Sequence, residues 1–79
     1  MSTILTYTVY AIPDCPFCVK AKELLDDKNI SYEYIVLRDI EKRKKIGKQY
    51  NMNTAPIILH NNKLVGGYTE LKNYFSEKI

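Results

Sequence analysis

The sequence Cys15-Pro16-Phe17-Cys18 lies between an apolar run and a run with helical spacing, and it holds both cysteines of the 79-residue chain. Proline is favoured at the first position of a helix, where its missing N–H would have had no partner. We therefore expect Cys15 at the N-cap of a helix and Cys18 one turn inside it. Backbone N–H groups of the first turn and the helix dipole would then favour a thiolate at Cys15. The pattern predicts an asymmetric pair, with Cys15 exposed and activated and Cys18 behind it.

The cysteine pair allows three interpretations. A structural disulfide between such close residues would close too short a loop to stabilise the fold much. A zinc site needs about four ligands, and His60 is the only other good candidate in the sequence. A redox dithiol needs the two cysteines alone and suits a C-x-x-C near a βαβ pattern, so we favour this interpretation.

The composition indicates an ordinary globular protein, with 46% hydrophobic and 27% charged residues and a net charge of +3. This length predicts one domain, residues 1–79, with a single core, and we expect a monomer. The mild charge does not indicate a nucleic-acid partner. No apolar run is long enough to span a membrane, and the N-terminus does not read as a signal peptide. We therefore expect a cytoplasmic protein, in a reducing compartment where a vicinal dithiol is more often catalytic than structural.

The first half of the chain predicts a strand, a helix and a second strand. Residues Ile4–Ala11 are rich in β-branched and aromatic types, and Ser31–Leu37 has a similar character. Between them, Pro16 to about Lys28 has apolar residues at helical spacing, and Asn29 is a plausible terminator. Two strands joined by one helix in this way should be parallel neighbours in the sheet.

A second helix is expected from the cap residue Asp39 to about Tyr50, with Ile40, Ile46 and Tyr50 facing inward. Its opposite face carries a run of charged residues: Glu41, Lys42, Arg43, Lys44, Lys45 and Lys48. Such a face is either a solvated surface or a docking face for acidic partner proteins.

The second half of the chain predicts a hairpin and a last helix. Pro56–His60 and Lys63–Val65 are short strands, and Asn61-Asn62 between them is a strong turn signal. Gly66-Gly67 ends the hairpin, and Tyr68–Lys78 is the last helix. The order β-α-β-α-β-β-α predicts an α/β fold: a four-stranded mixed sheet flanked by three helices.

Three motifs in this order resemble the glutaredoxin family of the thioredoxin-like superfamily. Tyr10 and Cys15-Pro16-Phe17-Cys18 resemble the segment around the family's CPYC. Thr54-Ala55-Pro56 resembles its TVP, in which the proline peptide bond is cis. Gly66-Gly67-Tyr68-Thr69-Glu70-Leu71 resembles its GGxxDL signature. The resemblance covers essentially the whole chain and implies a thioredoxin-like fold.

The resemblance also implies an activity and a binding site. It implies a glutathione-dependent thiol-disulfide oxidoreductase that reduces protein disulfides and glutathionylated proteins, with Cys15 as nucleophile and Cys18 as resolving thiol. Glutathione would be the reducing co-substrate, and no metal or prosthetic group would be bound. Ala55 would pair with the cysteinyl part of glutathione, and Thr69 would lie where the γ-glutamyl end binds. The implied glutathione-binding residues are Phe17, Thr54, Ala55, Pro56, Gly67, Tyr68 and Thr69.

Several positions depart from the family pattern. Ile12 stands where many glutaredoxins have lysine, and Asn53 or Met52 stands where many have a basic residue. Asp14 adds a negative charge beside Cys15, which opposes the thiolate. Thr69 replaces an acidic residue. Glutathione binding should therefore be weaker than in relatives with the full ionic set, with partial compensation from Lys48 or Gln49.

Two rival functions remain open, with a bare scaffold role as a third. One is a glutaredoxin-like electron donor that is reduced by a thioredoxin reductase. The other, from a different class, is a protein that binds or carries a [2Fe–2S] cluster as a dimer bridged through Cys15.

Overall fold

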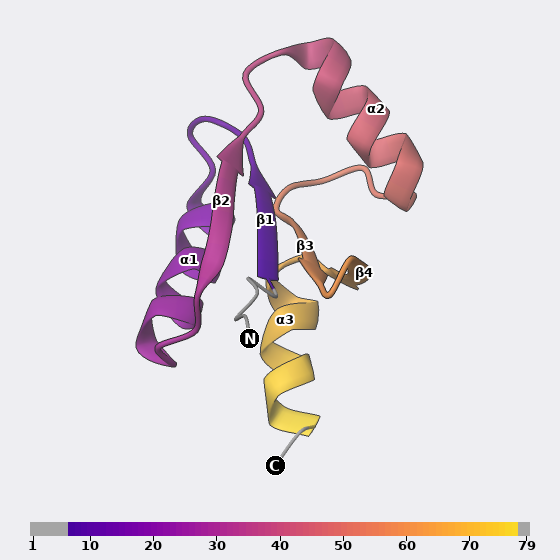
Figure 1. Cartoon of the computed structure of the whole chain (residues 1–79). Helices are drawn as coiled ribbons and strands as arrows, with labels where there is room; N and C mark the ends of the chain where they lie inside the picture. Colours follow the sequence, from indigo (N-terminus) through magenta and orange to yellow (C-terminus); the bar gives the residue numbers. More distant parts are fainter. Residues whose placement is uncertain (1–6, 78–79) are drawn as a thin grey trace, which may run out of the picture.

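The computed structural model describes residues 7–77 of the chain, so residues 4–6 of the first predicted strand and Lys78 of the last helix lie outside the described range. Over that range, no helix is long and apolar enough to cross a membrane. The predicted order of elements is confirmed (Figure 1): β1 (Tyr7–Ala11), α1 (Pro16–Asp27), β2 (Tyr32–Val36), α2 (Ile40–Tyr50), β3 (Ile57–His60), β4 (Lys63–Gly66) and α3 (Tyr68–Glu77).

The strands form one mixed sheet in the order β2-β1-β3-β4. The predicted parallel pair is confirmed, with Tyr7 of β1 opposite Tyr32 of β2. Strand β3 runs antiparallel to both β1 and β4. The predicted turn between β3 and β4 is also confirmed, since Asn61 and Asn62 have φ of 54° and 66°. Strand β1 is therefore central, and the chain leaves its carboxyl end directly into the cysteine loop.

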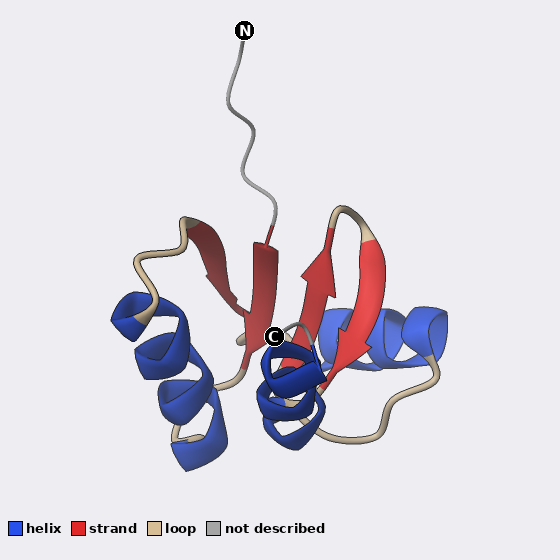
Figure 2. Ribbon diagram, turned by 90° about the horizontal axis from the view of Figure 1, so that it is seen from below, coloured by secondary structure: helices blue, strands red, loops and turns tan. Residues whose placement is uncertain are grey.

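Helices α1 and α3 lie side by side against the sheet (Figure 2). The core between these layers consists of fully buried side chains from both helices and both central strands: Val9, Ala21, Leu25, Ile58 and Leu71. Burying one such large aliphatic side chain stabilises a fold by about 1.5–3 kcal/mol. The core thus holds α1, and the cysteines at its first turn, firmly against β1.

Helix α1 ends at a left-handed residue. Asn29 has a φ of 57°, a conformation that asparagine tolerates better than most residues. Its N–H donates to the Asp26 carbonyl at 3.0 Å, and the N–H of Ile30 donates to the Leu25 carbonyl at 3.0 Å. These two bonds form a Schellman motif, which satisfies carbonyls left free at the helix end. The prediction that Asn29 terminates this helix is confirmed.

Helix α2 begins as predicted, because the Asp39 carboxylate accepts a hydrogen bond from the Glu41 N–H at 2.9 Å. The prediction that Ile40 faces inward is wrong, since its side chain is 59% exposed. The first turn of α2 lies beyond the end of the sheet (Figure 1), where it has no core to cover. Gly47 is the buried residue of this helix instead.

Gly47 ties the end of α2 to the loop that follows. Its carbonyl accepts the N–H of Met52 at 2.8 Å. A Cβ at this glycine would lie only 2.6 Å from the Met52 carbonyl oxygen, so a larger residue would displace backbone. The glycine therefore sets the path by which the chain enters Thr54-Ala55-Pro56.

Candidate active site

The two cysteines occupy the predicted positions at the start of α1. Cys15 is the N-cap, with Pro16 in the first turn, and its sulfur accepts the Cys18 N–H at 3.2 Å. The two sulfurs are joined in a disulfide, with their Cα atoms 5.2 Å apart. Cys15 is half-buried, whereas Cys18 is 0% exposed. A molecule arriving from solvent can therefore reach the sulfur of Cys15 but not that of Cys18.

The loop before β3 lies across from Cys15. The Cys15 sulfur is 4.0 Å from the carbonyl oxygen of Ala55. The peptide bond between Ala55 and Pro56 is cis, as the resemblance implied. On the other side of Cys15, Asp14 is exposed and adopts a φ of 55°. Its carboxylate thus belongs to the same short loop as the sulfur.

A groove of about 270 Å³ opens beside this loop and unites three separate segments of the sequence. It contains every residue that the resemblance assigned to glutathione, together with one that it did not: Phe17, Thr54, Ala55, Pro56, Gly67, Tyr68, Thr69 and Glu70. A helix residue, the loop before β3 and the start of α3, which are separate in the chain, thus form one site at the first turn of α1. The sequence reasoning missed Glu70 as a member of this site.

Glu70 caps helix α3. Gly67 is the N-cap, since its carbonyl accepts the Leu71 N–H at 3.0 Å. The Glu70 carboxylate reaches back to accept the Gly67 N–H at 2.8 Å. This contact is the acidic half of a capping box, and an acidic residue three positions after the cap is its sequence signal. An internal carboxylate therefore already accepts the Gly67 N–H at the helix end, next to Thr69, where the resemblance placed the γ-glutamyl end of glutathione.

Gly66 must be glycine for the same corner to form. Its φ is 128°, a conformation that L side chains rarely adopt. A Cβ there would also come within 2.7 Å of the Glu70 side chain. The glycine therefore lets Glu70 fold back over the start of α3.

Of the positions that depart from the family pattern, Thr69 lines the groove, whereas Ile12 and Asn53 do not. Ile12 and Asn53 line a second cavity of about 410 Å³, which also includes Tyr10 and Gly47 and extends to Ala55. This cavity is mostly apolar and separates α2 from the end of β1. Lys48 and Gln49, which we expected to compensate for missing charges, do not line the groove.

His60 belongs to an aromatic cluster at the opposite end of β1. Its Nδ1 lies 2.6 Å from the Tyr74 hydroxyl, and its ring stacks on Tyr7 at 4.1 Å between centroids. Burial is the main cause that raises the pKa of Tyr7 above its ordinary value, and the neighbouring Tyr74 adds to the same shift. Because Tyr7 begins β1 and the cysteines follow its end, His60 is not beside Cys15. Within residues 7–77, no three His, Cys, Asp or Glu side chains gather as metal ligands.

Comparisons with known proteins agree with these features. A sequence profile of the glutaredoxin family matches residues 5–65. Glutaredoxin 1 of Rickettsia prowazekii is 40% identical over 79 residues, which cover 96% of this chain and 83% of that protein. The crystal structure of Francisella tularensis glutaredoxin 1 complexed with cacodylate superposes with a TM-score of 0.81 at 28% identity, covering 91% and 93% of the two chains. A buckwheat glutaredoxin–glutathione complex shares the fold, with a TM-score of 0.83 at 17% identity over 92% and 70% of the two chains.

Proposed function

This chain belongs to the glutaredoxin family and is a thiol-disulfide oxidoreductase, and we propose that glutathione is its reducing co-substrate. The observation that carries the proposal is the position of the Cys15–Cys18 disulfide beside the groove between α1, the loop before β3 and the start of α3. We further propose that the protein acts as a monomer on disulfide-containing and glutathionylated proteins.

The reaction with a protein disulfide begins at Cys15. In the reduced protein, the Cys15 thiolate attacks one substrate sulfur, forms a mixed disulfide and releases the other substrate sulfur, which takes up a proton. The Cys18 thiol then loses its proton and attacks the Cys15 sulfur, which forms the Cys15–Cys18 disulfide and releases the second substrate sulfur as a thiolate that takes up a proton. Two electrons and two protons thus pass from the dithiol to the substrate. Exchange with two molecules of glutathione restores the dithiol and yields glutathione disulfide.

The Cys18 N–H supports the assignment of Cys15 as nucleophile. It points at the Cys15 sulfur from 3.2 Å, and a hydrogen bond from a helix N-terminus favours the thiolate. The burial of Cys18 supports its role as the resolving thiol, because only a group already inside the site can approach it. Pro16 lies between the two and starts the helix at the position that this arrangement needs.

The groove provides two kinds of polar contact for glutathione. The backbone of Ala55 faces the Cys15 sulfur and can pair with the cysteinyl part of an extended ligand. The N–H groups of Tyr68 and Thr69 and the Thr69 hydroxyl lie at the positive end of α3, which suits a carboxylate. The buckwheat glutaredoxin was crystallised with glutathione, which supports such a site in this fold.

The same groove predicts modest affinity for glutathione. Ile12 and Asn53 bring no charge to its vicinity, and the Glu70 carboxylate adds a negative charge at the start of α3. An exposed ion pair contributes about 0–1 kcal/mol, so the loss of two such pairs corresponds to roughly tenfold weaker binding. Backbone contacts at Ala55 need no particular side chain and remain.

A coupled assay tests the choice of reductant. The purified protein is given a glutathionylated peptide and NADPH, either with glutathione and glutathione reductase or with thioredoxin reductase alone. We expect NADPH oxidation with the glutathione system. Turnover with thioredoxin reductase but none at millimolar glutathione would overturn the proposal and favour the rival electron donor. A brown purified dimer with visible absorbance would instead favour the cluster-binding rival.

A further inference from the structure

Four side chains form a continuous row beside the reactive cysteine. The Lys20 Nζ lies 5.3 Å from the centre of the Phe17 ring, and the Phe17 ring lies 6.1 Å from the Tyr68 ring. The Lys72 Nζ in turn lies 6.0 Å from the centre of the Tyr68 ring. We call these four residues the aromatic–lysine strip. It crosses from α1 to α3, and each end holds an ammonium group against an aromatic face.

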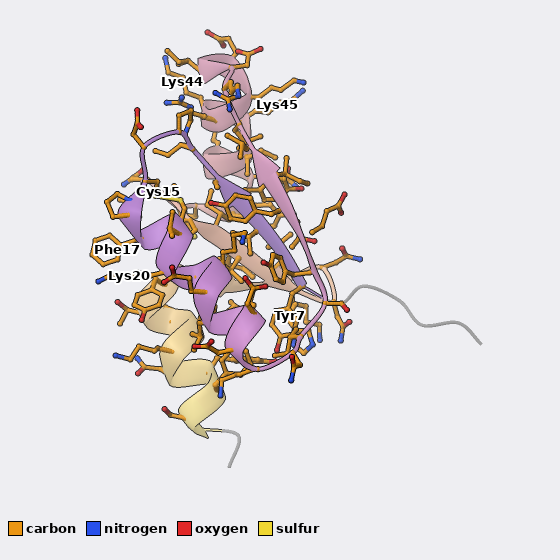
Figure 3. All side chains as sticks on the ribbon, turned by 90° about the vertical axis from the view of Figure 1, so that its left-hand side faces the viewer. Tyr7, Cys15, Phe17, Lys20, Lys44 and Lys45 are labelled. Carbon is orange, nitrogen blue, oxygen red and sulfur yellow. A yellow bond between two sulfur atoms is a disulfide. The ribbon has the colours of Figure 1, made fainter. Side chains whose placement is uncertain are left out.

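The strip extends beyond the groove. Phe17 and Tyr68 line the groove, but Lys20 and Lys72 do not. A ligand confined to the groove would therefore leave both ammonium groups uncovered. Figure 3 shows Lys20 beyond Phe17 as seen from Cys15. A partner that covers the whole strip must be larger than the groove.

Two large apolar side chains near Cys15 are exposed to solvent. Phe17 is 54% exposed and Val19 is 48% exposed. Val19 lines a shallow hollow on the other flank of Cys15, which it shares with Ile12, Tyr34 and the exposed Asp14, so a carboxylate also faces this flank. Apolar side chains thus flank the sulfur on both sides, as expected of a surface that a protein substrate covers during disulfide exchange.

We propose that the aromatic–lysine strip is a docking surface for protein substrates that carry an acidic side chain two or three residues from the disulfide cysteine. Lys20 lies five residues after Cys15, which corresponds to about 7.5 Å along a helix. An extended substrate segment covers that distance in two or three residues. Lysine ammonium groups complement a substrate carboxylate, and the aromatic rings cover its apolar neighbours. The inference rests on the thiol–disulfide exchange of the proposed function, but not on glutathione as the reductant.

The basic face of α2 offers an alternative site for acidic partners, and it supplies the control. Lys44 and Lys45 lie well apart from Lys20 and Phe17 (Figure 3). Lys45 is exposed, as Lys20 is. Lys20→Glu and Lys45→Glu also change the net charge by the same amount. The two variants therefore distinguish a local contact at the strip from the overall field of the protein.

The experiment uses the reduced protein in a single turnover, which requires no glutathione. Two synthetic peptides each contain one intrapeptide disulfide. One has aspartates two and three residues from each cysteine, and the other has asparagines at the same positions. The second-order rate of peptide reduction is measured for wild type, Lys20→Glu, Lys72→Glu and Lys45→Glu at low and high salt. Because variants are compared on the same peptide, differences in intrinsic peptide reactivity cancel.

We expect Lys20→Glu and Lys72→Glu each to slow reduction of the aspartate peptide by about two- to tenfold relative to the asparagine peptide at low salt. High salt should largely remove this difference, and Lys45→Glu should retain the wild-type preference. An equal loss in Lys45→Glu, or no loss in either strip variant, would overturn the proposal.

A parallel measurement separates the two sources of a carboxylate. The same variants are assayed with the mixed disulfide of glutathione and cysteamine, in which glutathione itself brings the only carboxylates. A fall of the same size with this substrate would assign the two lysines to glutathione and overturn the docking proposal. Failure of the glutathione-coupled assay alone would contradict the proposed reductant and leave the peptide result to stand.

Discussion

Replacement of Cys18 by serine should separate two reactions that the wild-type site performs together. A mixed disulfide between Cys15 and a protein substrate is resolved in the wild type by Cys18, whose Cα is 5.2 Å from that of Cys15. In Cys18→Ser, only glutathione from solution can resolve it. A conservative effective concentration of about 1 M for the internal thiol, well below the upper range for oriented groups, exceeds 1 mM glutathione by roughly a thousandfold. We expect protein-disulfide reduction to fall by about 100- to 1,000-fold.

Removal of glutathione from a small mixed disulfide should respond differently. That substrate transfers glutathione to Cys15, and a second glutathione then resolves the intermediate without help from Cys18. We expect Cys18→Ser to keep this rate within about threefold of wild type. The assay follows both substrates at several glutathione concentrations. The residual protein-disulfide reduction by the variant should rise in proportion to glutathione, because the external thiol has become the resolving group.

Cys18 is 0% exposed, so the serine hydroxyl must find a partner in the interior. The variant Cys18→Ala provides a control without that hydroxyl, and thermal unfolding of both variants reports any loss of stability. The reasoning is refuted if both folded variants lose mixed-disulfide turnover along with protein-disulfide reduction. It is also refuted if protein-disulfide reduction stays near the wild-type rate.

Three further changes test other contacts. Ile12→Lys should lower the KM for glutathione by up to about fivefold at low salt. Because an ion pair would cause this effect, the effect should shrink at high salt. A fall in KM that does not depend on salt would contradict the ion pair. Glu70→Ala should lower the free energy of unfolding in urea by about 0.5–2 kcal/mol through loss of the bond to the Gly67 N–H, and Glu70→Gln should cost less; the reverse order would contradict the capping role. Tyr32 donates to Asp26 at 2.7 Å and, as the largest cause, lowers the pKa of that carboxyl. This stabilisation is present above the ordinary carboxyl pKa and is lost as the pH falls through the folded pKa, so the destabilisation in Tyr32→Phe should be larger at pH 7 than near pH 2.

The elements were predictable because their ends are marked by local chemistry. Pro16 starts α1, Asn29 ends it in a left-handed conformation, and Asp39 caps α2. Asn61-Asn62 forms the turn of the β3–β4 hairpin. Each of these effects acts within a few residues, so it can be read without knowledge of the tertiary structure. The same holds for the order of Cys15 and Cys18 at the helix start.

Other features depend on distant parts of the chain and were not predictable from spacing. Ile40 follows the apolar pattern of its helix, yet it is exposed because the first turn of α2 extends beyond the sheet. The groove was expected only through resemblance to a family, since no periodicity brings Thr54 beside Gly67. Glu70 had a recognisable capping signal, but its place in the groove follows from how α3 meets the loop before β3.

The close approach of Gly47 to the Met52 carbonyl has a consequence for how the sequence of α2 can change in evolution. Gly47 is the buried residue among the eleven of this helix, and its lysines are exposed, so the lysine positions can change charge with little effect on the core. The glycine itself cannot, because any side chain would collide with the Met52 carbonyl and shift the segment leading to the groove. Sequence drift at the exposed positions of α2 can therefore change the protein's net charge, while Gly47 remains constrained by the path of the chain into the site.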